Sequence, residues 1–447
     1  MKLKNIILIV CVILKNQSLT AQTRTIGLKE CIQLALANKS SILALKTNAS
    51  IDSLNSIQLK AKYFPEVALV YDYLYNPIIR TNIVPTGKFS PVPTDEVRPI
   101  KFGTSFNQSA GLQILQPIFD ASIKGRIAET NLQRKIKQAE IKTANEDLAF
   151  EVAQSFSKLL LKQKQLKEIE FDTLRTAKIL SFSNDRFVEG KVLKTEVNKT
   201  QINHNNAVFA LQELLSSLVV EKIFLGFLIN IPANEFDVAD ADNLFNQTNL
   251  ALIDESTNVN SLALIQEYDK KVDLVKLQLK NEKVKYLPTL SAKGYAGADQ
   301  FSNQLNPFQS NSWFGNAFVG LSARLPLLIG ENKKNKQGQY QAQILGLNLQ
   351  KEEVIKNAAF KKQTAKQEIA KLQAEYNFHK SNVMLYKENL AIYQERLQAG
   401  QETVNTINLE EIVYLKETEQ LNIVDSKVWQ YWLTYLKNAG LLFRITQ

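Results

Sequence analysis

Cysteine and histidine are scarce in this chain of 447 residues, which contains two of each. Cys11 lies in an apolar run near the start, so Cys31 is the only cysteine beyond that run and has no partner for an intramolecular disulfide. The two histidines, His204 and His379, are far apart and lack carboxylate companions at ligand spacing. We therefore expect no metal site and no cofactor.

Motifs for catalysis and for nucleotide binding are also missing. The sequence has no P-loop pattern, no glycine-rich dinucleotide turn and no Ser/His/Asp arrangement typical of hydrolases. The net charge is +10, and no dense basic stripe carries interleaved aromatic residues. We expect neither an enzyme nor a nucleic-acid-binding protein.

A long apolar run occurs only at the start of the chain. Lys2 and Lys4 precede the nine apolar residues of 6–14, and 18–21 offers a cleavage site before Gln22. Nine apolar residues are too few to cross a bilayer, so this pattern predicts a signal peptide over 1–21 and an exported protein. Removal of its three lysines would lower the net charge to about +7.

The sequence does contain an internal repeat. Pro65 in the run 60–69 returns as Pro288 in the run 282–291, an offset of 223, and 111–117 returns as 320–326 at an offset of 209. The run 185–190 returns as 395–400 at an offset of 210. Stable offsets over half a chain predict two copies of one unit, 22–230 and 258–447. The fall in offset places 14 extra residues of the first copy between Pro65 and Pro117.

Each copy reads as helix, strand, loop, strand, very long helix, turn and helix. The first helix begins at Leu28 and continues toward Pro65, because apolar residues recur there at helical spacing. Proline disfavours helix in the residue before it. Pro65 and Pro288 therefore mark the change from helix to strand, and Pro117 and Pro326 mark the change back to helix.

The predicted strands alternate between apolar and polar residues. One face carries the residues that we expect to point outward: Val67, Leu69, Tyr71, Tyr73, Tyr75, Leu112, Ile114, Val319 and Leu321. About ten residues with one apolar face is the length of a membrane β-strand. A half-buried strand in a soluble sandwich has the same pattern, so the strands alone leave both alternatives open.

Two long helices follow the strand pairs. Apolar residues recur every seven positions: Val152, Leu159, Leu166, Leu180 and Phe187 in the first copy, with Thr173 also in register, and Ile369, Tyr376, Val383, Leu390 and Leu397 in the second. Helices of about 70 residues are roughly 100 Å long, and sustained heptads predict coiled-coil packing. Each helix ends near a glycine, Gly190 or Gly400, before another apolar-periodic helix returns. Each copy therefore ends in a long antiparallel hairpin.

The segments between these elements are predicted to be irregular. The range 231–257 holds six acidic residues and no basic one, and we expect a solvated connector there. The ranges 77–108 and 299–312 join the strand pairs, and the first contains five prolines. Because proline cannot donate a ladder hydrogen bond, we expect irregular extracellular loops.

Four strands cannot close a membrane barrel, and open sheet edges are not tolerated in lipid. Several chains must therefore share one barrel, with eight strands from a dimer or twelve from a trimer. Cyclic symmetry would align the helical hairpins into a tube that continues the barrel. This arrangement describes a duct.

The chain resembles the TolC-like outer membrane factors over nearly all of 26–443. The resemblance rests on the segments 28–38, 63–65, 115–119 and 186–190, with Glu196-Val197 after them. It implies a fold of mixed α and membrane β, a homotrimer that shares a 12-stranded barrel and a twelve-helix α-barrel. It also implies a passive efflux or type I secretion duct in the outer membrane of a Gram-negative bacterium, with a long periplasmic extension. The implied partners are outer-membrane lipid, a periplasmic adaptor and an inner-membrane pump of RND, ABC or MFS type.

The resemblance implies that the hairpin tips form the periplasmic gate. The candidate gate residues are Asp185, Arg186, Phe187, Gly190, Glu196, Val197, Arg396, Leu397, Gly400, Glu402 and Thr406. Five of them depart from the family pattern: Asp185 stands where the family has a glutamine, Glu196 replaces an aspartate and preserves its charge, Leu397 replaces a tyrosine, Glu402 replaces an arginine and Thr406 replaces an aspartate. A second aspartate of the family is replaced by Leu409. The family's lock and acidic constriction are therefore not retained.

A second hypothesis comes from another class of protein. Long heptads and β-hairpins also suit a periplasmic coiled-coil protein with a structural or adaptor-like role that never enters a membrane. The outward strand face, for example Tyr71 and Leu112, distinguishes the two hypotheses, because only the duct needs detergent.

Overall fold

The computed structural model describes residues 24–85, 95, 97–239, 259, 262–305, 313–327, 333–399, 401–402 and 404–446. The predicted signal peptide and Gly400 lie outside these residues. The chain forms two compact units, and each unit takes residues from both copies of the repeat. The first comprises the described parts of 1–48, 137–269 and 348–447, and the second those of 49–136 and 270–347.

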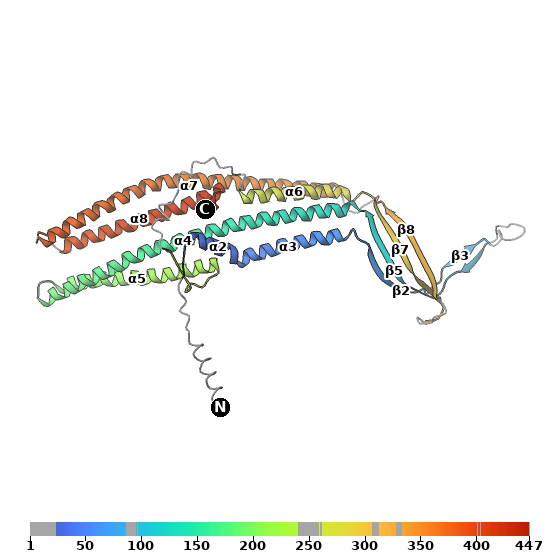
Figure 1. The fold of residues 1–447 in the computed structure, drawn as a ribbon, viewed down its shortest axis with the longest axis horizontal. Helices are drawn as coiled ribbons and strands as arrows, with labels where there is room; N and C mark the ends of the chain where they lie inside the picture. The colour runs from blue at the N-terminus through green and yellow to red at the C-terminus, as the bar shows by residue number, and fades with distance from the viewer. Residues whose placement is uncertain are drawn as a thin grey trace, which may run out of the picture. The chain divides into compact units, whose positions relative to one another are not determined.

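The first unit contains two long helical hairpins (Figure 1). Its elements are β1 (Arg24–Ile26), α2 (Leu28–Asn38), most of α4 (Ala121–Val188), α5 (Lys194–Ile229), β6 (Phe236–Val238), most of α7 (Lys333–Gln398), α8 (Val404–Ala439) and the 3-10 helix η5 (Leu442–Thr446). The core of this unit includes Phe156, Trp432 and Tyr435, each at most 4% exposed.

The predicted heptad positions form the interiors of the hairpins. Val152 and Leu159 of α4 are fully buried, and Ile369 of α7 is 1% exposed. Toward the tips the burial falls, and Phe187 is 40% exposed. The helix pairing that the seven-residue spacing predicts is therefore confirmed, with its best packing away from the tips.

The repeat extends to the bounds of several elements. Helices α5 and α8 each have 36 residues, and their starts are separated by the same offset as the two tips. Each is followed by a residue with left-handed backbone, Asn230 at φ 59° and Gly440 at φ 72°, again at that offset. Helices α3 (Ser40–Ala61) and α6 (Ala263–Val284) each have 22 residues, and their starts are separated by the same offset as Pro65 and Pro288. The offsets seen in the sequence therefore describe equivalent elements.

The second unit is built on a four-stranded antiparallel sheet with the order β2–β5–β7–β8 (Figure 1). The strands are β2 (Glu66–Tyr75), β5 (Phe106–Phe119), β7 (Thr289–Ser302) and β8 (Trp313–Arg324). Both edge strands, β2 and β8, have one free edge within this sheet. The register pairs Leu69 with Leu112 and Gly294 with Val319.

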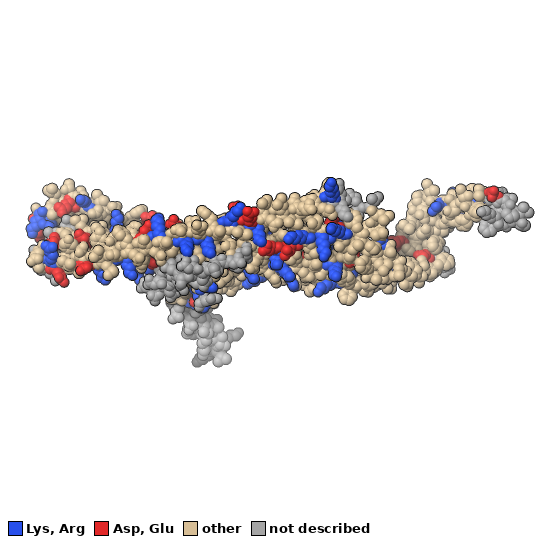
Figure 2. Space-filling view, turned by 90° about the horizontal axis from the view of Figure 1, so that it is seen from above, with Lys and Arg blue, Asp and Glu red and all other residues tan. Residues whose placement is uncertain are grey.

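The residues predicted to point outward do share one face of this sheet, because the register places them on alternate positions of paired strands. Val319 is 91% exposed and Leu69 is 81% exposed. Figure 2 shows that, on the face viewed, charged side chains gather over the helices and are sparse over the strands. Among the described helices, none has an apolar stretch of sufficient length to cross a membrane.

Two predicted boundaries are wrong. Pro117 does not end its strand, because β5 continues to Phe119, with a register shift after Pro117 that accommodates the ring. Helix α4 then begins after Asp120, whose carboxylate accepts a hydrogen bond from the backbone N–H of Ser122. The first predicted helix is also two helices, α2 and α3, with extended backbone at Lys39 between them.

Three segments predicted to be irregular contain strands. The range 77–108 includes the hairpin of β3 (Thr81–Val84) and β4 (Arg98–Lys101) and the start of β5, and the range 299–312 includes the end of β7. The acidic range 231–257 begins with β6, which pairs in parallel with β1 and buries Phe236. Its remaining residues, from 240 onward, lie outside the described part.

Candidate functional site

The first hairpin tip closes through a glycine. Gly190 has φ +70°, a conformation that costs L-residues about 1–2 kcal/mol. The backbone N–H of Lys191 donates to the carbonyl of Arg186 at 2.8 Å, and the N–H of Gly190 donates to that of Phe187 at 2.9 Å. These two bonds form the motif in which a left-handed glycine ends a helix.

The second tip repeats the first of these two hydrogen bonds, which spans five residues. The backbone N–H of Gln401 donates to the carbonyl of Arg396 at 2.9 Å, at positions equivalent in the repeat to those of Lys191 and Arg186. Gly400 and the side chain of Leu397 lie outside the described part. The two tips are therefore equivalent in backbone as far as the structure describes them.

Side chains at the tips differ between the copies. In the first, Lys194 lies 5.4 Å from the ring centre of Phe187, and Val197 is buried just beyond the turn. In the second, Arg396 and Glu402 form an ion pair at 3.9 Å across the turn. Glu402 therefore contacts an arginine of its own tip, which the sequence did not predict.

The other candidate tip residues take different positions. The guanidinium of Arg186 lies 5.6 Å from the ring centre of Phe182, one turn earlier on α4. Asp185 and Glu196 are exposed and flank the first turn, while Thr406 is half-buried in the first turn of α8. The structure thus places the described candidates at or beside the two tips, but their role in gating stays a prediction.

The prolines at the strand ends occupy short connecting segments. Pro65 lies between α3 and β2, and Pro288 lies between α6 and β7, as predicted. Pro326 follows soon after β8. Near the first junction, the amide of Gln116 donates to the carbonyl of Tyr63 at 2.6 Å, so the end of β5 is tied to the connection before β2.

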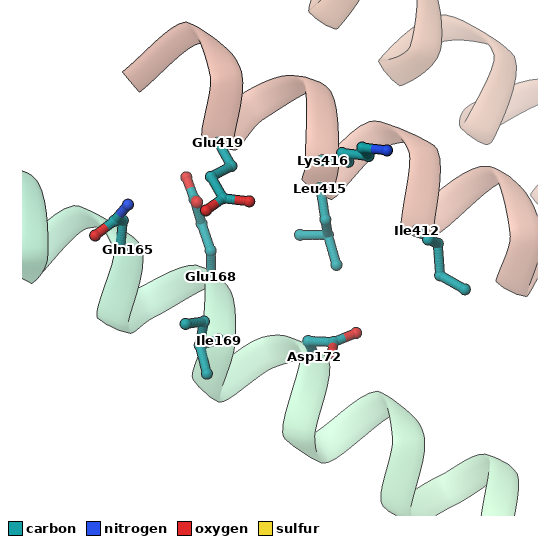
Figure 3. Close-up of a pocket in the computed structure, with 8 residues that line it drawn as sticks. All are labelled: Gln165, Glu168, Ile169, Asp172, Ile412, Leu415, Lys416 and Glu419. Carbon is teal, nitrogen blue, oxygen red and sulfur yellow. The ribbon is translucent and has the colours of Figure 1, made fainter. Parts of the chain in front are cut away.

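A cavity of about 200 Å³ lies between α4 and α8 in the first unit, and the sequence did not predict it. Its lining comprises Gln165, Glu168, Ile169 and Asp172 of α4 and Ile412, Leu415, Lys416 and Glu419 of α8. Figure 3 shows the side chains of Glu168 and Glu419 reaching toward each other from the two helices. The lining thus combines three carboxylates with one lysine.

The electrostatics of this contact are unusual for a helix surface. Partial burial and the neighbouring charge of Glu419 raise the pKa of Glu168 to about 7, although Asn422 donates a hydrogen bond to it at 2.6 Å. Burial also raises the pKa of Asp425, further along α8, to about 6, although Lys164 opposes this effect. Asp172, by contrast, is paired with Arg175 at 2.6 Å.

No sequence signal identified the carboxylates of the cavity, because they lie outside the heptad positions. In the sequence they look like ordinary charged residues on a solvated helix surface. Glu168 follows the heptad residue Leu166 by two positions and so lies on a different face of α4. The spacing within α4 does not reveal that this face packs against α8. Within the described part of the chain, no three His, Cys, Asp or Glu side chains are grouped as metal ligands.

Solved structures of outer membrane channels have this fold. The outer membrane protein VceC from Vibrio cholerae has a TM-score of 0.67 at 15% identity, covering 92% of this chain and 96% of VceC. The Campylobacter jejuni channel CmeC has a TM-score of 0.70 at 14% identity, covering 93% of this chain and 86% of CmeC. The Neisseria gonorrhoeae channel MtrE, in its open state, has a TM-score of 0.65 at 14% identity, covering 94% of this chain and 90% of MtrE.

These likenesses confirm the predicted TolC-like fold of long helices with a few strands. No protein-family model and no curated protein sequence matches the chain. At such low identities, the likeness establishes the fold alone.

Proposed function

We propose that three copies of this chain form a channel in the outer membrane of a Gram-negative bacterium, with helices that extend into the periplasm. The channel passively conducts substrates that an inner-membrane pump delivers through a periplasmic adaptor. The similarity of the fold to outer membrane channels supports this proposal. The observation that carries it is the incomplete sheet.

Among the described residues, the sheet of one chain has an exposed apolar face and two edges that no other strand pairs. Leu69, Leu112 and Leu321 on that face are each more than half exposed. Strands β2 and β8 each offer a row of backbone groups that nothing in the sheet pairs. In lipid such groups are costly, and closure with neighbouring copies satisfies them. Three chains of four strands give a barrel of twelve.

Aromatic side chains support the placement of this sheet in a membrane. Tyr73 and Tyr75 lie on the apolar face near the end that leads into 76–105. The ring of Tyr75 stacks on Phe106 with a centroid separation of 4.9 Å. Membrane barrels carry aromatic residues where the lipid meets water, so this end fits the outer interface.

The helical hairpins also need partners. On α5, a series of large apolar side chains is exposed: Ile202, Phe209, Leu215, Val219, Val220, Ile223, Phe224 and Phe227. On α7, Phe360 and Phe378 are more than 60% exposed. Apolar surface of this extent marks an interface. Contact between α5 of one chain and α7 of the neighbouring chain would cover these two apolar surfaces and would close the helices of three chains into a tube.

Topology can be tested with two single cysteines. Cys31 is buried, and Cys11 lies in the predicted signal peptide, so the background of reactive thiols is low. Ile78 beside the sheet and Val188 at the first hairpin tip are each 86% exposed, which makes Ile78→Cys and Val188→Cys a matched pair. A membrane-impermeant maleimide should label the first on intact cells and the second only after the outer membrane is permeabilised.

The assembly is tested by native mass measurement of detergent-extracted protein, where we expect three chains in each particle. A soluble monomer that needs no detergent would favour the periplasmic coiled-coil alternative. Labelling of Val188→Cys but not Ile78→Cys on intact cells would reverse the proposed topology. Either result would overturn the proposal.

A further inference from the structure

The contact between α4 and α8 joins the first hairpin, α4–α5, to the second, α7–α8. Glu168 lies at the centre of this contact. The Nδ2 group of Asn422 donates to Oε1 of Glu168 at 2.6 Å, joining helices from the two copies of the repeat. Glu419 of α8 approaches the same carboxylate beside the cavity (Figure 3). Two carboxylates thus face each other where the hairpins meet.

The surrounding charges do not neutralise this pair fully. On α4, Lys164 lies one turn before Glu168, and Asp172 one turn after it is already paired with Arg175. On α8, Lys416 lines the cavity, and Asp425 lies near Lys164 of α4. Lys164 therefore faces two carboxylates, Glu168 and Asp425.

The two histidines, His204 of α5 and His379 of α7, lie on the helices that pair with α4 and α8. Each imidazole contacts a side chain other than Glu168. On α7, the ring of His379 is held by Glu417 at 2.7 Å, and Tyr376 lies near enough to Asp425 for its pKa to be raised, with burial the larger cause. On α5, His204 contacts Thr176 at 3.2 Å. Neither imidazole therefore serves as the counter-ion of Glu168.

We propose that Glu168 and Glu419 form a proton-operated joint that holds the two hairpins of one subunit together in acid and loosens them in base. When Glu168 is protonated, its O–H can donate a hydrogen bond to the Glu419 carboxylate, while Asn422 continues to donate to the other oxygen. When both groups are ionised, like charges meet in a partly buried cavity and repel. The proton moves between Glu168 and solvent water, so no other reactant is needed.

The titration range suits such a device. Because the pKa of Glu168 is about 7, the joint would change state near neutral pH, where an exposed glutamate is fully ionised. Asp425, with a pKa of about 6, ionises over a slightly lower range, where Lys164 of α4 favours its charged form. The joint would therefore loosen progressively as the pH rises from about 6 to 8.

This inference rests on the proposed channel function, so two measurements are needed. The purified protein in planar lipid bilayers should show an open fraction that rises at least threefold between pH 5.5 and pH 8.5. The variant Glu168→Gln keeps the shape and the acceptor for Asn422 but cannot ionise, and it should stay near the acid value at every pH. The matched control Glu151→Gln removes the same charge from an exposed position of α4 and should follow the wild type.

The second measurement does not depend on conduction. Nitroxide labels on Ser181→Cys of α4 and Asn408→Cys of α8 report the separation of the helices between the joint and the tips. The distance should lengthen with pH in the wild-type background and stay constant with Glu168→Gln. A distance change without conduction would sink the channel proposal and leave the joint standing. Conduction with neither pH dependence nor a distance change would overturn the joint alone.

Discussion

The ring of Tyr295 lies across Gly111 of the neighbouring strand. A Cβ at Gly111 would stand 2.7 Å from Cζ of Tyr295 and 2.8 Å from the carbonyl oxygen of Ala296. Gly111 pairs directly with Gly297, and a Cβ there would meet the Tyr295 hydroxyl at 2.7 Å. Two glycines on paired strands therefore make the space that one tyrosine fills on the more polar face of the sheet.

We expect Gly111→Ala to destabilise the sheet, because neither the ring nor the backbone can move without cost. Overpacking of this kind costs about 1–3 kcal/mol. The measurement is the temperature at which the detergent-solubilised oligomer dissociates. Gly320→Ala is the matched control, because no atom lies within 4 Å of a Cβ at that position of the same sheet. Equal temperatures for the two variants would show that Tyr295 does not depend on the glycine pair.

At the first tip, backbone conformation should matter more than side-chain size. A Cβ at Gly190 meets nothing within 4 Å, but φ is +70°. Gly190→Ala and Gly190→Val should both strain the turn by about 1–2 kcal/mol. Gly190→Asn should be milder, because asparagine tolerates this conformation. All three should assemble, and on the proposed function we expect loss of export with Ala and Val, measured as accumulation of the transported compound in cells. Normal export by the valine variant would mean that the tip is not the gate.

The sequence predicted the elements whose pattern is local. Heptads identified the hairpin interiors at Val152 and Ile369, and prolines identified the junctions at Pro65 and Pro288. Pro117 misled because a register shift lets a strand absorb a proline, which depends on the partner strand. Pro99 likewise lies within β4, in a two-stranded hairpin where an unpaired edge needs no donor.

The contact of α4 with α8 was not predictable for a different reason. A heptad defines one seam on a helix, and for α4 that seam packs within its own hairpin. Its second face meets α8 at the Glu168–Asn422 bond, between partners that are far apart in the sequence. Only tertiary structure decides which helix fills that position, so no spacing in the sequence marks Glu168 as different from other charged residues.

His379 and Glu417 should stabilise the second hairpin at neutral pH. Burial alone would raise the pKa of Glu417, but hydrogen bonds from Asn382 and His379 leave it below its ordinary value. A lowered pKa in the folded state means stability that is present above the unfolded pKa of about 4.3 and lost as the pH falls through the folded pKa. Glu417→Gln should therefore lower the dissociation temperature at pH 7, and this deficit should shrink as the pH falls below about 4.3. Glu388→Gln, on the exposed side of α7, is the control. A deficit that persists unchanged at pH 3 would contradict the ionic contribution.

Glu168 should show the opposite dependence. Its folded pKa is raised by burial and by Glu419 to about 7, so its favourable contribution is complete below the unfolded pKa of about 4.3 and disappears as the pH rises to about 7. Glu168→Gln removes the ionisation without removing the acceptor for Asn422. The variant should match the wild type near pH 4 and dissociate at a higher temperature at pH 8. The corresponding gain in the free energy of unfolding at pH 8 should be on the order of 1 kcal/mol after solvent screening. Glu417→Gln acts at lower pH, so a double variant should keep the flatter profile of Glu168→Gln between about pH 5 and pH 8, at a lower dissociation temperature. A wild-type dissociation temperature that rises over this range, with no gain for Glu168→Gln at pH 8, would show that the carboxylate is ionised in the folded protein without cost.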